Sequence, residues 1–514
     1  MSVFLIQNLL EKASEQWPDK TAIIDGETKL SFKSISDRSS CLAVKIRKEI
    51  NLYDRVAVYL NKSIEQIICY FAILKAGGVV VLIDETSSEF QITHIVKDCS
   101  ARLLIYEDDR RKNLNTLLKN NDLLSLPKSS IESHSLGEST TDKQLMNDMA
   151  MIIYTSGSTG LAKGVVLSHR NILDGAIIVG SYLGVKHEDT ILALLPFHFD
   201  YGLNQLMLAM LNGAELVLHK YIFPESLFKC IDKNKVTILP ALPPVWSSVF
   251  NEKYVDIDMV LKKRSLSSVR VITNTGGKLT LKLILKIRDI FSKAEIFLMY
   301  GLTEAFRSTY LEPKWVDRKP ESIGKAIPGV RVEIIDRNNK ICAPNEVGEL
   351  VHFGALISKG YWGDPKQTAI RFRANPLLKE NSYLEKVVYS GDLAYKDDDG
   401  FIFFVGRKDE MIKISGYRVS PTEVETLIMQ HKNIEEAVAF SMEVGDETII
   451  RAVISLTGQT QPSHLKLFFK KIAPAHLIPK EFIIVATMPK MSNGKVDRSK
   501  IKKNYSSYSG DSLC

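Results

Sequence analysis

The sequence predicts an α/β protein with a large N-terminal body of several sheets and a small C-terminal α+β lobe. Three observations support this prediction. The chain has 514 residues, which is too long for one hydrophobic core and implies two or more packed units. Helical apolar spacing alternates with short, wholly apolar segments, as in a sheet that helices cover on both faces. Near Gly406 this alternation gives way to shorter strands and one well-marked helix.

The clearest element of the body is a helix expected over residues 64–76, which the pair Gly77-Gly78 ends and a strand at 79–83 follows. Residues 127–147 are polar and are expected to form an exposed connection. Other apolar strands are expected at 149–153, 191–195, 215–218, 236–239, 269–272 and 401–405.

We place the boundary between the two units at 406–410, with a body over 1–405 and a lobe over 411–514. The helix that opens the lobe has a readable start. Ser420 is the expected N-cap, Pro421 takes the first helical position, and Glu423 stands three residues after the cap, which predicts a capping box.

The composition, with 45% hydrophobic and 25% charged residues, is that of a globular protein. The net charge of +7 is spread along the chain, and its most basic stretch, 495–503, is typical of a solvated face, so no nucleic acid partner is expected. The six cysteines lack metal-ligand spacing and are interpreted as reduced thiols of a cytoplasmic protein. Neither a membrane span nor a signal peptide is expected, because no long apolar run and no basic leader occur.

The most informative motif is YTSGSTGLAKGVVLSH at 154–169. Small residues with free N–H groups and hydroxyls can close around a polyphosphate, and Lys163 offsets its charge. A P-loop is excluded because Lys163 precedes Gly164 and no hydroxyl follows. A plain turn is the simpler alternative, but a loop of this length that ends in a lysine favours nucleotide binding. The residues expected to contact ATP here are Thr155, Ser156, Gly157, Ser158, Thr159, Gly160 and Lys163.

With five further segments, this loop resembles the AMP-forming adenylating superfamily of acyl-CoA synthetases, peptide-synthetase adenylation domains and luciferases. The segments are NTGGK at 274–278, MYGLTEA at 299–305, YSGD at 389–392, GRKDEMIKISGYRV at 406–419 and PKMSNGKVDR at 489–498. They follow the family's order and cover most of the chain. The pattern looks most like the stand-alone ligases that accompany bacterial exosortase systems.

The resemblance implies the superfamily's fold, in which the C-terminal lobe is mobile. It also implies that the chain adenylates a carboxylic acid with ATP and Mg²⁺ and releases pyrophosphate. The acyl group would then pass to the thiol of CoA or of the phosphopantetheine on a separate carrier protein.

The resemblance also implies a role for each matching residue. Attack of a carboxylate on the α-phosphorus brings two anions together, so cations and positioning carry the catalysis. Glu304 would hold Mg²⁺, Thr303 would give a hydroxyl to phosphate, and Lys495 would bridge the carboxylate and the α-phosphate. Asp392 would bind the ribose hydroxyls, and Arg407 would contact ribose or phosphate unless it forms an ion pair between the domains. Gly276, Gly277 and Tyr300 complete the expected ATP site.

For the thiol step, the lobe would rotate about Asp409 and bring Gly416 to the active site, where a glycine lets the thiol arm approach. A simple β-turn is the alternative for Gly416. Two other functions stay open, namely an adenylating enzyme without a thioester step, including luciferase-like oxidation, and a regulatory nucleotide-binding module. The catalytic residues Glu304, Asp392 and Lys495 argue against a module that only senses ATP.

The acid is expected to be small and polar, and an amino acid is one candidate. Asp200 matches the position where amino-acid-activating members hold the substrate's ammonium group. A buried carboxylate needs a cation, which is either that ammonium group or Arg307. If Arg307 neutralises Asp200, the argument for an amino acid fails; Arg307 could instead hold a second polar or acidic group. The expected pocket residues are His198, Asp200, Tyr201, Asn204, Val245, Thr275, Gly276, Gly277, Met299, Arg307 and Ser308.

Overall fold

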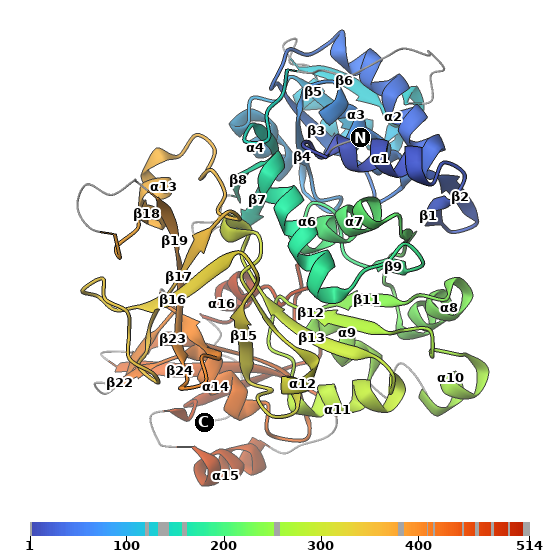
Figure 1. Cartoon of the computed structure of the whole chain (residues 1–514). Helices are drawn as coiled ribbons and strands as arrows, with labels where there is room; N and C mark the ends of the chain where they lie inside the picture. Colours follow the sequence, from blue (N-terminus) through green and yellow to red (C-terminus); the bar gives the residue numbers. More distant parts are fainter. Residues whose placement is uncertain are drawn as a thin grey trace.

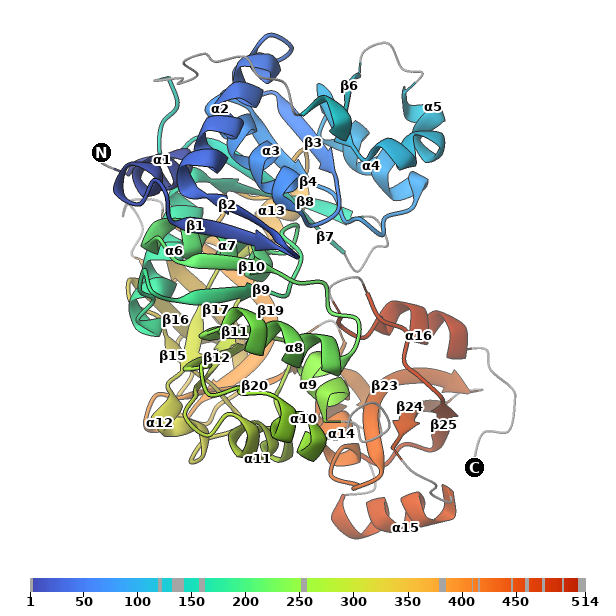
Figure 2. The same ribbon diagram turned by 90° about the vertical axis from the view of Figure 1, so that its right-hand side faces the viewer.

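The computed structural model contains two large sheets in the body and a separate small lobe. In Figures 1 and 2 the six-stranded sheet lies at the top of the molecule, the larger sheet in the middle and the lobe, in orange and red, at the lower end. The predicted fold class is confirmed. The structure describes residues 3–118, 123–131, 143–156, 162–250, 257–378, 385–408, 410–414, 417–444, 447–457, 462–473, 477–491 and 494–506.

The six-stranded sheet has the order β6-β5-β3-β4-β7-β8. Its strands are parallel except for β8, which returns antiparallel to β7 and so forms a hairpin around the glycine-rich loop. The predicted helix over 64–76 is α3 (Ile64–Lys75), which ends before Gly77 at φ +87°. The strands are β3 (Arg55–Tyr59), β4 (Val79–Leu82), β5 (Leu103–Tyr106), β6 (Leu124–Pro127), β7 (Met149–Ser156) and β8 (Ala162–Ser168).

The larger sheet joins a parallel half to an antiparallel half, in the order β16-β17-β19-β20-β15-β14-β13-β12-β11-β9-β10-β1-β2, with β18 beside β19. The two halves meet at β13 and β14; the candidate site motifs of the body lie at the ends of β12 and β13 in the parallel half and on β19 and β20 in the antiparallel half. The strands are β1 (Thr21–Asp25), β2 (Thr28–Ser31), β9 (Thr190–Ala193), β10 (Glu215–Leu218), β11 (Ile238–Ala241), β12 (Val271–Asn274), β13 (Glu295–Tyr300), β14 (Thr309–Leu311), β15 (Ser322–Ala326), β16 (Val330–Ile335), β17 (Gly348–Gly354), β18 (Phe372–Ala374), β19 (Lys386–Lys396) and β20 (Ile402–Arg407).

The main core of the body lies between its two sheets, where helices α6 and α7 pack against each other and against both sheets (Figure 1). Nearly every residue of α7 is buried, although the helix carries Asp200, Asn204 and Gln205. None of the described helices could span a bilayer. The helices of the body are α1 (Gln7–Gln16), α2 (Phe32–Arg47), α4 (Glu89–Asp98), α5 (Asn115–Leu118), α6 (His169–Leu183), α7 (Asp200–Asn212), α8 (Pro224–Asn234), α9 (Pro243–Val249), α10 (Ile257–Lys263), α11 (Leu281–Ile290), α12 (Pro313–Val316) and α13 (Pro365–Arg371).

Two predicted strands start later than expected. The strands expected at 236–239 and 269–272 are β11 and β12, and each begins and ends two residues further on. The reason is the residue pairing, because Ile238 is the first residue of β11 to pair with both neighbouring strands, while the preceding Thr237 binds Asp189 through its hydroxyl at 2.7 Å. As a result, β12 delivers the chain directly into Thr275-Gly276.

The lobe has its own apolar cores and a three-stranded sheet in the order β23-β24-β25. The strands β23 and β24 are antiparallel, whereas β25 joins β24 in parallel. The elements of the lobe are β21 (Ile412–Ile414), β22 (Tyr417–Val419), α14 (Pro421–Ile428), β23 (Ile434–Val444), β24 (Glu447–Leu456), α15 (Pro462–Ile472), β25 (Glu481–Val485) and α16 (Arg498–Tyr505).

The predicted capping box at the start of α14 is wrong. Ser420 is the N-cap residue and Pro421 the first helical residue, but the Ser420 side chain makes no capping hydrogen bond. Its hydroxyl instead donates to the Val405 carbonyl at 2.7 Å, across the boundary between body and lobe. Strand β20 also continues through Arg407, so the sheet of the body extends into the predicted hinge. The domain division itself stays a prediction.

Candidate active site

The glycine-rich segment lies on the hairpin β7–β8, in which Thr155 pairs with Lys163. The Lys163 ammonium donates to the Gln367 side chain at 3.3 Å and lies 5.9 Å from the centre of the Tyr361 ring. Residues 359–362 reach this place because they run beside β8, where Val165 and Tyr361 form a bridge. Gly157, Ser158, Thr159, Gly160 and the side chain of Ser156 lie outside the described part of the structure, so the phosphate-contacting role of the loop stays a prediction.

Glu304 lies just after β13 and faces the same tyrosine. The Tyr361 hydroxyl donates to the Glu304 carboxylate at 2.5 Å, and burial together with this carboxylate raises the Tyr361 pKa. Glu304 and Lys163 therefore contact one aromatic ring from two distant segments. Sequence reasoning missed Tyr361, although it lies in a short glycine- and aromatic-rich segment at 359–364 that could have drawn attention.

The donor set around Glu304 fits a nucleotide-bound Mg²⁺. Within the described ranges no group of three or more His, Cys, Asp or Glu side chains could hold a metal ion. Mg²⁺ in phosphate sites is commonly held by one or two carboxylates, with phosphate oxygens and waters completing the shell. A single carboxylate beside a phosphate loop matches that chemistry. Thr303, one residue earlier, is buried.

The predicted ribose carboxylate forms a compact cluster at the junction of β13, β19 and β20. Asp392 pairs in register with Arg407, whose Nη1 lies 3.0 Å from Asp392 Oδ1. The Tyr300 hydroxyl donates to the other carboxylate oxygen. Burial raises the pKa of Asp392, and the nearby Arg407 opposes this shift. The Oδ1 atom has no hydrogen-bond partner among the described residues apart from this ion-pair contact, so it could still accept from a sugar hydroxyl. Arg407 thus forms at least one ion pair within the body.

Lys495 reaches from the lobe into the body. A Cβ atom built on Gly276 would lie 2.7 Å from Lys495 Cε, so the lysine stem passes directly over this glycine, whose φ is +76°. The Lys495 ammonium lies 5.2 Å from the centre of the Phe199 ring. Burial lowers the pKa of Lys495, and the carboxylate of Asp200 opposes this shift. The amine predicted to drive adenylation is thus enclosed between the end of β12 and the start of α7.

The predicted acyl pocket contains a buried ion pair. Arg307 Nη1 lies 3.0 Å from Asp200 Oδ2, and both side chains are 5% exposed. Of the two partners considered for Asp200, the structure places Arg307 beside it. Arg307 also donates to the Phe306 carbonyl at 2.7 Å. Phe306 has φ +38°, a strained value for a non-glycine residue, and its ring fills the space over Gly175 in α6. Sequence gave no signal of this strained residue, which sets the direction of Arg307.

The other pocket residues differ in what they contact. The Tyr201 hydroxyl lies 2.5 Å from Thr273 Oγ1, and Met299 Sδ accepts from Tyr182 at 3.0 Å. His198 lies 3.8 Å from Asp84. Val245 on α9 and Thr275 after β12 are buried. Next to them, Gly277 packs under the first turn of α9. Three buried polar atoms have no hydrogen-bond partner among the described residues, namely Asn204 Nδ2, Arg307 Nε and Ser308 Oγ.

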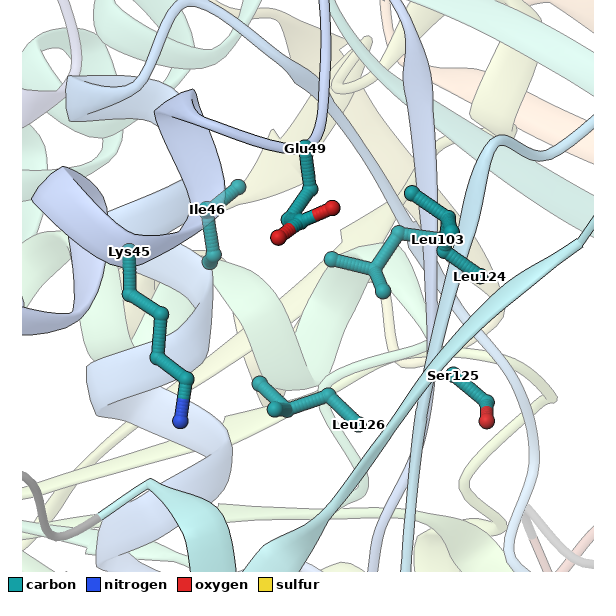
Figure 3. A pocket seen from close by; sticks show the side chains of 7 residues that line it. All are labelled: Lys45, Ile46, Glu49, Leu103, Leu124, Ser125 and Leu126. Atoms are coloured by element: carbon teal, nitrogen blue, oxygen red, sulfur yellow. The ribbon is translucent and has the colours of Figure 1, made fainter.

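Two predicted residues of the thiol step, Asp409 and Gly416, lie outside the described residues. A separate pocket of about 170 Å³ lies between α2 and strands β5 and β6. Figure 3 shows Lys45 at the left of this pocket, Glu49 above it, Leu126 below it and Leu103 at its right. Since Lys45 already donates to a backbone carbonyl at 3.0 Å and no motif residue lines this pocket, it is not the candidate active site.

Comparison with known proteins identifies the family of this chain. A family model for "AMP-binding enzyme" matches residues 10–362, and one for "AMP-binding enzyme C-terminal domain" matches 423–495. Tyrocidine synthase 2 of Brevibacillus parabrevis is 28% identical over 97% of this chain, and gramicidin S synthase 2 of Aneurinibacillus migulanus is 30% identical over 96%. The chain spans only 13% and 11% of the length of these two proteins.

Solved structures show the same fold. The Bacillus subtilis O-succinylbenzoate coenzyme A synthetase, in complex with AMP, superposes with a TM-score of 0.84 at 23% identity, covering 96% of this chain and 98% of that one. The anthranilate CoA ligase AuaEII, in complex with anthranoyl-AMP, has a TM-score of 0.86 at 22% identity, with 98% of each chain covered. ATP-bound MatB of Rhodopseudomonas palustris has a TM-score of 0.86 at 21% identity, covering 98% and 99% of the two chains.

Proposed function

The chain belongs to the family of AMP-binding enzymes, and on this premise we propose that it activates a carboxylic acid as an acyl-adenylate. ATP and the acid would react to give the adenylate and pyrophosphate. The acyl group would then pass to a thiol. The observation that carries this proposal is the position of Lys495, a lysine of the lobe enclosed beside Gly276 and Phe199 of the body. A protein that only senses nucleotides needs no amine delivered in this way.

In the first step, a carboxylate oxygen of the acid attacks the α-phosphorus, and the bond from that phosphorus to the pyrophosphate oxygen breaks. The Lys495 ammonium would offset the charge that builds up between the two anions. Lys163 would face the β- and γ-phosphates, and Asp392 would hold the ribose. Mg²⁺, when bound by Glu304 and phosphate oxygens, would neutralise charge on the leaving pyrophosphate. Tyr361 would fix the orientation of the Glu304 carboxylate through its hydroxyl.

In the second step, the sulfur of the thiol attacks the acyl carbon, the bond to the AMP oxygen breaks, and AMP leaves with the electron pair while the thiol proton goes to solvent. Lys495 must withdraw before the thiol can enter. We propose Asp409 as the hinge of that movement and Gly416 as the point where the thiol arm passes. CoA and the phosphopantetheine of a carrier protein are both proposed acceptors, since the solved relatives named above are CoA ligases and the sequence relatives are peptide synthases.

We propose a cytoplasmic location, because ATP and reduced thiols are both found there. The proposed partners are a small carboxylic acid and the thiol acceptor, with no role for nucleic acid.

The test is acid-dependent exchange of labelled pyrophosphate into ATP, measured across amino, hydroxy, aryl and fatty acids. We expect at least one class to support exchange, and Lys495→Ala to abolish it. Lys495→Arg is the matched control, because it keeps the positive charge but changes the shape and position of the charged group. Absence of exchange with every acid, despite tight binding of ATP, would favour the regulatory module instead.

A further inference from the structure

We propose that the acyl pocket selects a carboxylic acid whose remaining part is uncharged and carries a hydrogen-bond acceptor, such as a hydroxyl or carbonyl oxygen. The pocket would therefore reject α-amino acids in their zwitterionic form. This inference rests on the proposed function and concerns the same site. It follows from which charges in the pocket are already paired and which donors are not.

Both oxygens of the Asp200 carboxylate are already in contact with donors of the protein. Its Oδ2 atom contacts Arg307 Nη1 at 3.0 Å, and its Oδ1 atom accepts from the Tyr201 backbone N–H at 2.8 Å. Arg307 is also fixed, because its guanidinium lies over the rings of Tyr201 and Phe306 at 5.4 and 5.2 Å. A substrate ammonium group would have to compete with a permanently charged, buried and stacked guanidinium for this carboxylate.

The ion pair in the pocket has no net charge, because Asp200 and Arg307 neutralise each other. The Lys495 ammonium would face the reacting carboxylate and the α-phosphate. An ammonium group or a second carboxylate elsewhere on the acid would therefore find no opposite charge in this pair to compensate it. Burial of an unpaired charge is strongly unfavourable, so the rest of the acid should be neutral.

The remaining donors favour a polar group over a hydrocarbon. Asn204 lies one turn after Asp200 on α7, so both side chains lie on the same face of that helix. Asn204 is 2% exposed, and its Nδ2 atom has no hydrogen-bond partner among the described residues. Arg307 Nε is also buried and likewise has no hydrogen-bond partner among the described residues. A buried donor without an acceptor is costly, and an acceptor oxygen on the acid would relieve that cost.

This preference separates the chain from amino-acid-activating enzymes that its sequence resembles. The aspartate at the matching position is present, but its charge serves Arg307. Sequence alone could not separate the two uses, because the two residues stand 107 positions apart and either pairing agrees with the motif.

The experiment compares matched acids by kcat/KM in the pyrophosphate exchange assay. Each set shares one carbon skeleton and carries hydrogen, hydroxyl, ammonium or carboxylate at the same carbon, as in propionate, lactate, alanine and methylmalonate, with parallel four-carbon and aryl sets. The acid with the highest kcat/KM should carry a hydroxyl or carbonyl oxygen. Its kcat/KM should exceed that of its ammonium and dicarboxylate counterparts at least about tenfold, and that of the unsubstituted acid by a smaller factor.

Two variants test the reason for the preference. Arg307→Gln frees the Asp200 carboxylate and should raise kcat/KM for the ammonium acid relative to the hydroxy acid, whereas Arg307→Lys keeps a cation and should not. If the Arg307 variants do not fold, Asn204→Leu should remove the preference for hydroxyl over hydrogen and leave the rejection of ammonium unchanged.

A wild-type preference for the ammonium or dicarboxylate member would overturn the inference but leave adenylation intact. Equal use of hydroxy and unsubstituted acids would overturn the role of the unpartnered donors. Failure of every acid to support exchange would instead overturn the proposed function itself.

Discussion

Removal of Arg307 should destabilise the body by an amount that depends on pH. At 3.0 Å, two opposite unit charges attract each other by about 5 kcal/mol at an effective dielectric constant of 20. In Arg307→Met the Asp200 carboxylate stays buried without its cation. It can avoid that state by taking up a proton, which costs an aspartate side chain in water about 4 kcal/mol at pH 7 and about 1.5 kcal/mol at pH 5. Since the protein takes the cheaper state, these values cap the cost of the unpaired charge, which we expect to dominate the loss.

We therefore expect Arg307→Met to lower the free energy of unfolding by about 3 to 4 kcal/mol at pH 7 and by about 1.5 kcal/mol at pH 5. In Asp200→Asn the arginine cannot lose its charge, so that loss should not change between these pH values. The double variant Asp200→Asn with Arg307→Met should lose less than either single variant, because no unpaired charge remains.

Urea unfolding followed by tryptophan fluorescence measures the loss of stability in the body, since all four tryptophans belong to the body. Arg288 provides a matched control, because its ion pair with Asp317 at 3.0 Å is exposed and its replacement by Met should cost less than about 1 kcal/mol. Equal losses for Arg307→Met at pH 5 and pH 7, or losses that simply add in the double variant, would refute the reasoning.

Four further outcomes follow from the site. Tyr361→Phe removes the hydroxyl that orients Glu304 and should raise the Mg²⁺ concentration for half-maximal exchange about tenfold; an unchanged Mg²⁺ dependence would contradict this role. Gly276→Ala places a Cβ 2.7 Å from the Lys495 stem and should lower exchange about 100-fold without loss of the fold, as judged by urea unfolding; retained activity would show that Lys495 works elsewhere. Burial lowers the pKa of Lys495, and only its ammonium form offsets charge. The exchange rate should therefore decline with rising pH at values well below the ordinary lysine pKa of about 10.4, and in Lys495→Arg this decline should move to higher pH. Burial lowers the pKa of His169 to about 4, so the free energy of unfolding should decrease by about 3 kcal/mol as the pH falls from above 6.5 to 4. The variant His169→Asn should lose less free energy of unfolding over the same range, and an equal loss in the variant and the wild type would rule this out.

The candidate site residues could be named from the sequence because each motif is local. The strand at 215–218 agrees with β10 residue for residue, and α3 ends at the predicted glycine pair. Elements whose ends depend on neighbouring strands were less predictable, as β11 and β12 show. The Ser420 hydroxyl likewise binds a carbonyl of the body instead of its own helix, and a local capping rule cannot anticipate a competing partner 15 residues away in the chain.

Contacts between distant segments were beyond the sequence. The hydroxyl of Tyr361 meets Glu304 across 57 positions, and Arg307 meets Asp200 across more than a hundred. The positive φ of Phe306 is imposed by packing over Gly175, and no motif encodes it. These contacts decide the surroundings of Glu304 and the charge of the predicted acyl pocket, which explains why the family was predictable from motifs and the acid was not.

The most direct test of the central claim traces one oxygen atom. An acid identified by the exchange assay is labelled with ¹⁸O in both carboxylate oxygens, and the adenylate is trapped with hydroxylamine so that no thiol acceptor is required. If a carboxylate oxygen attacks the α-phosphorus, the released AMP carries one ¹⁸O atom and pyrophosphate carries none. Recovery of the label in inorganic phosphate, or of unlabelled AMP alongside the trapped product, would contradict the account.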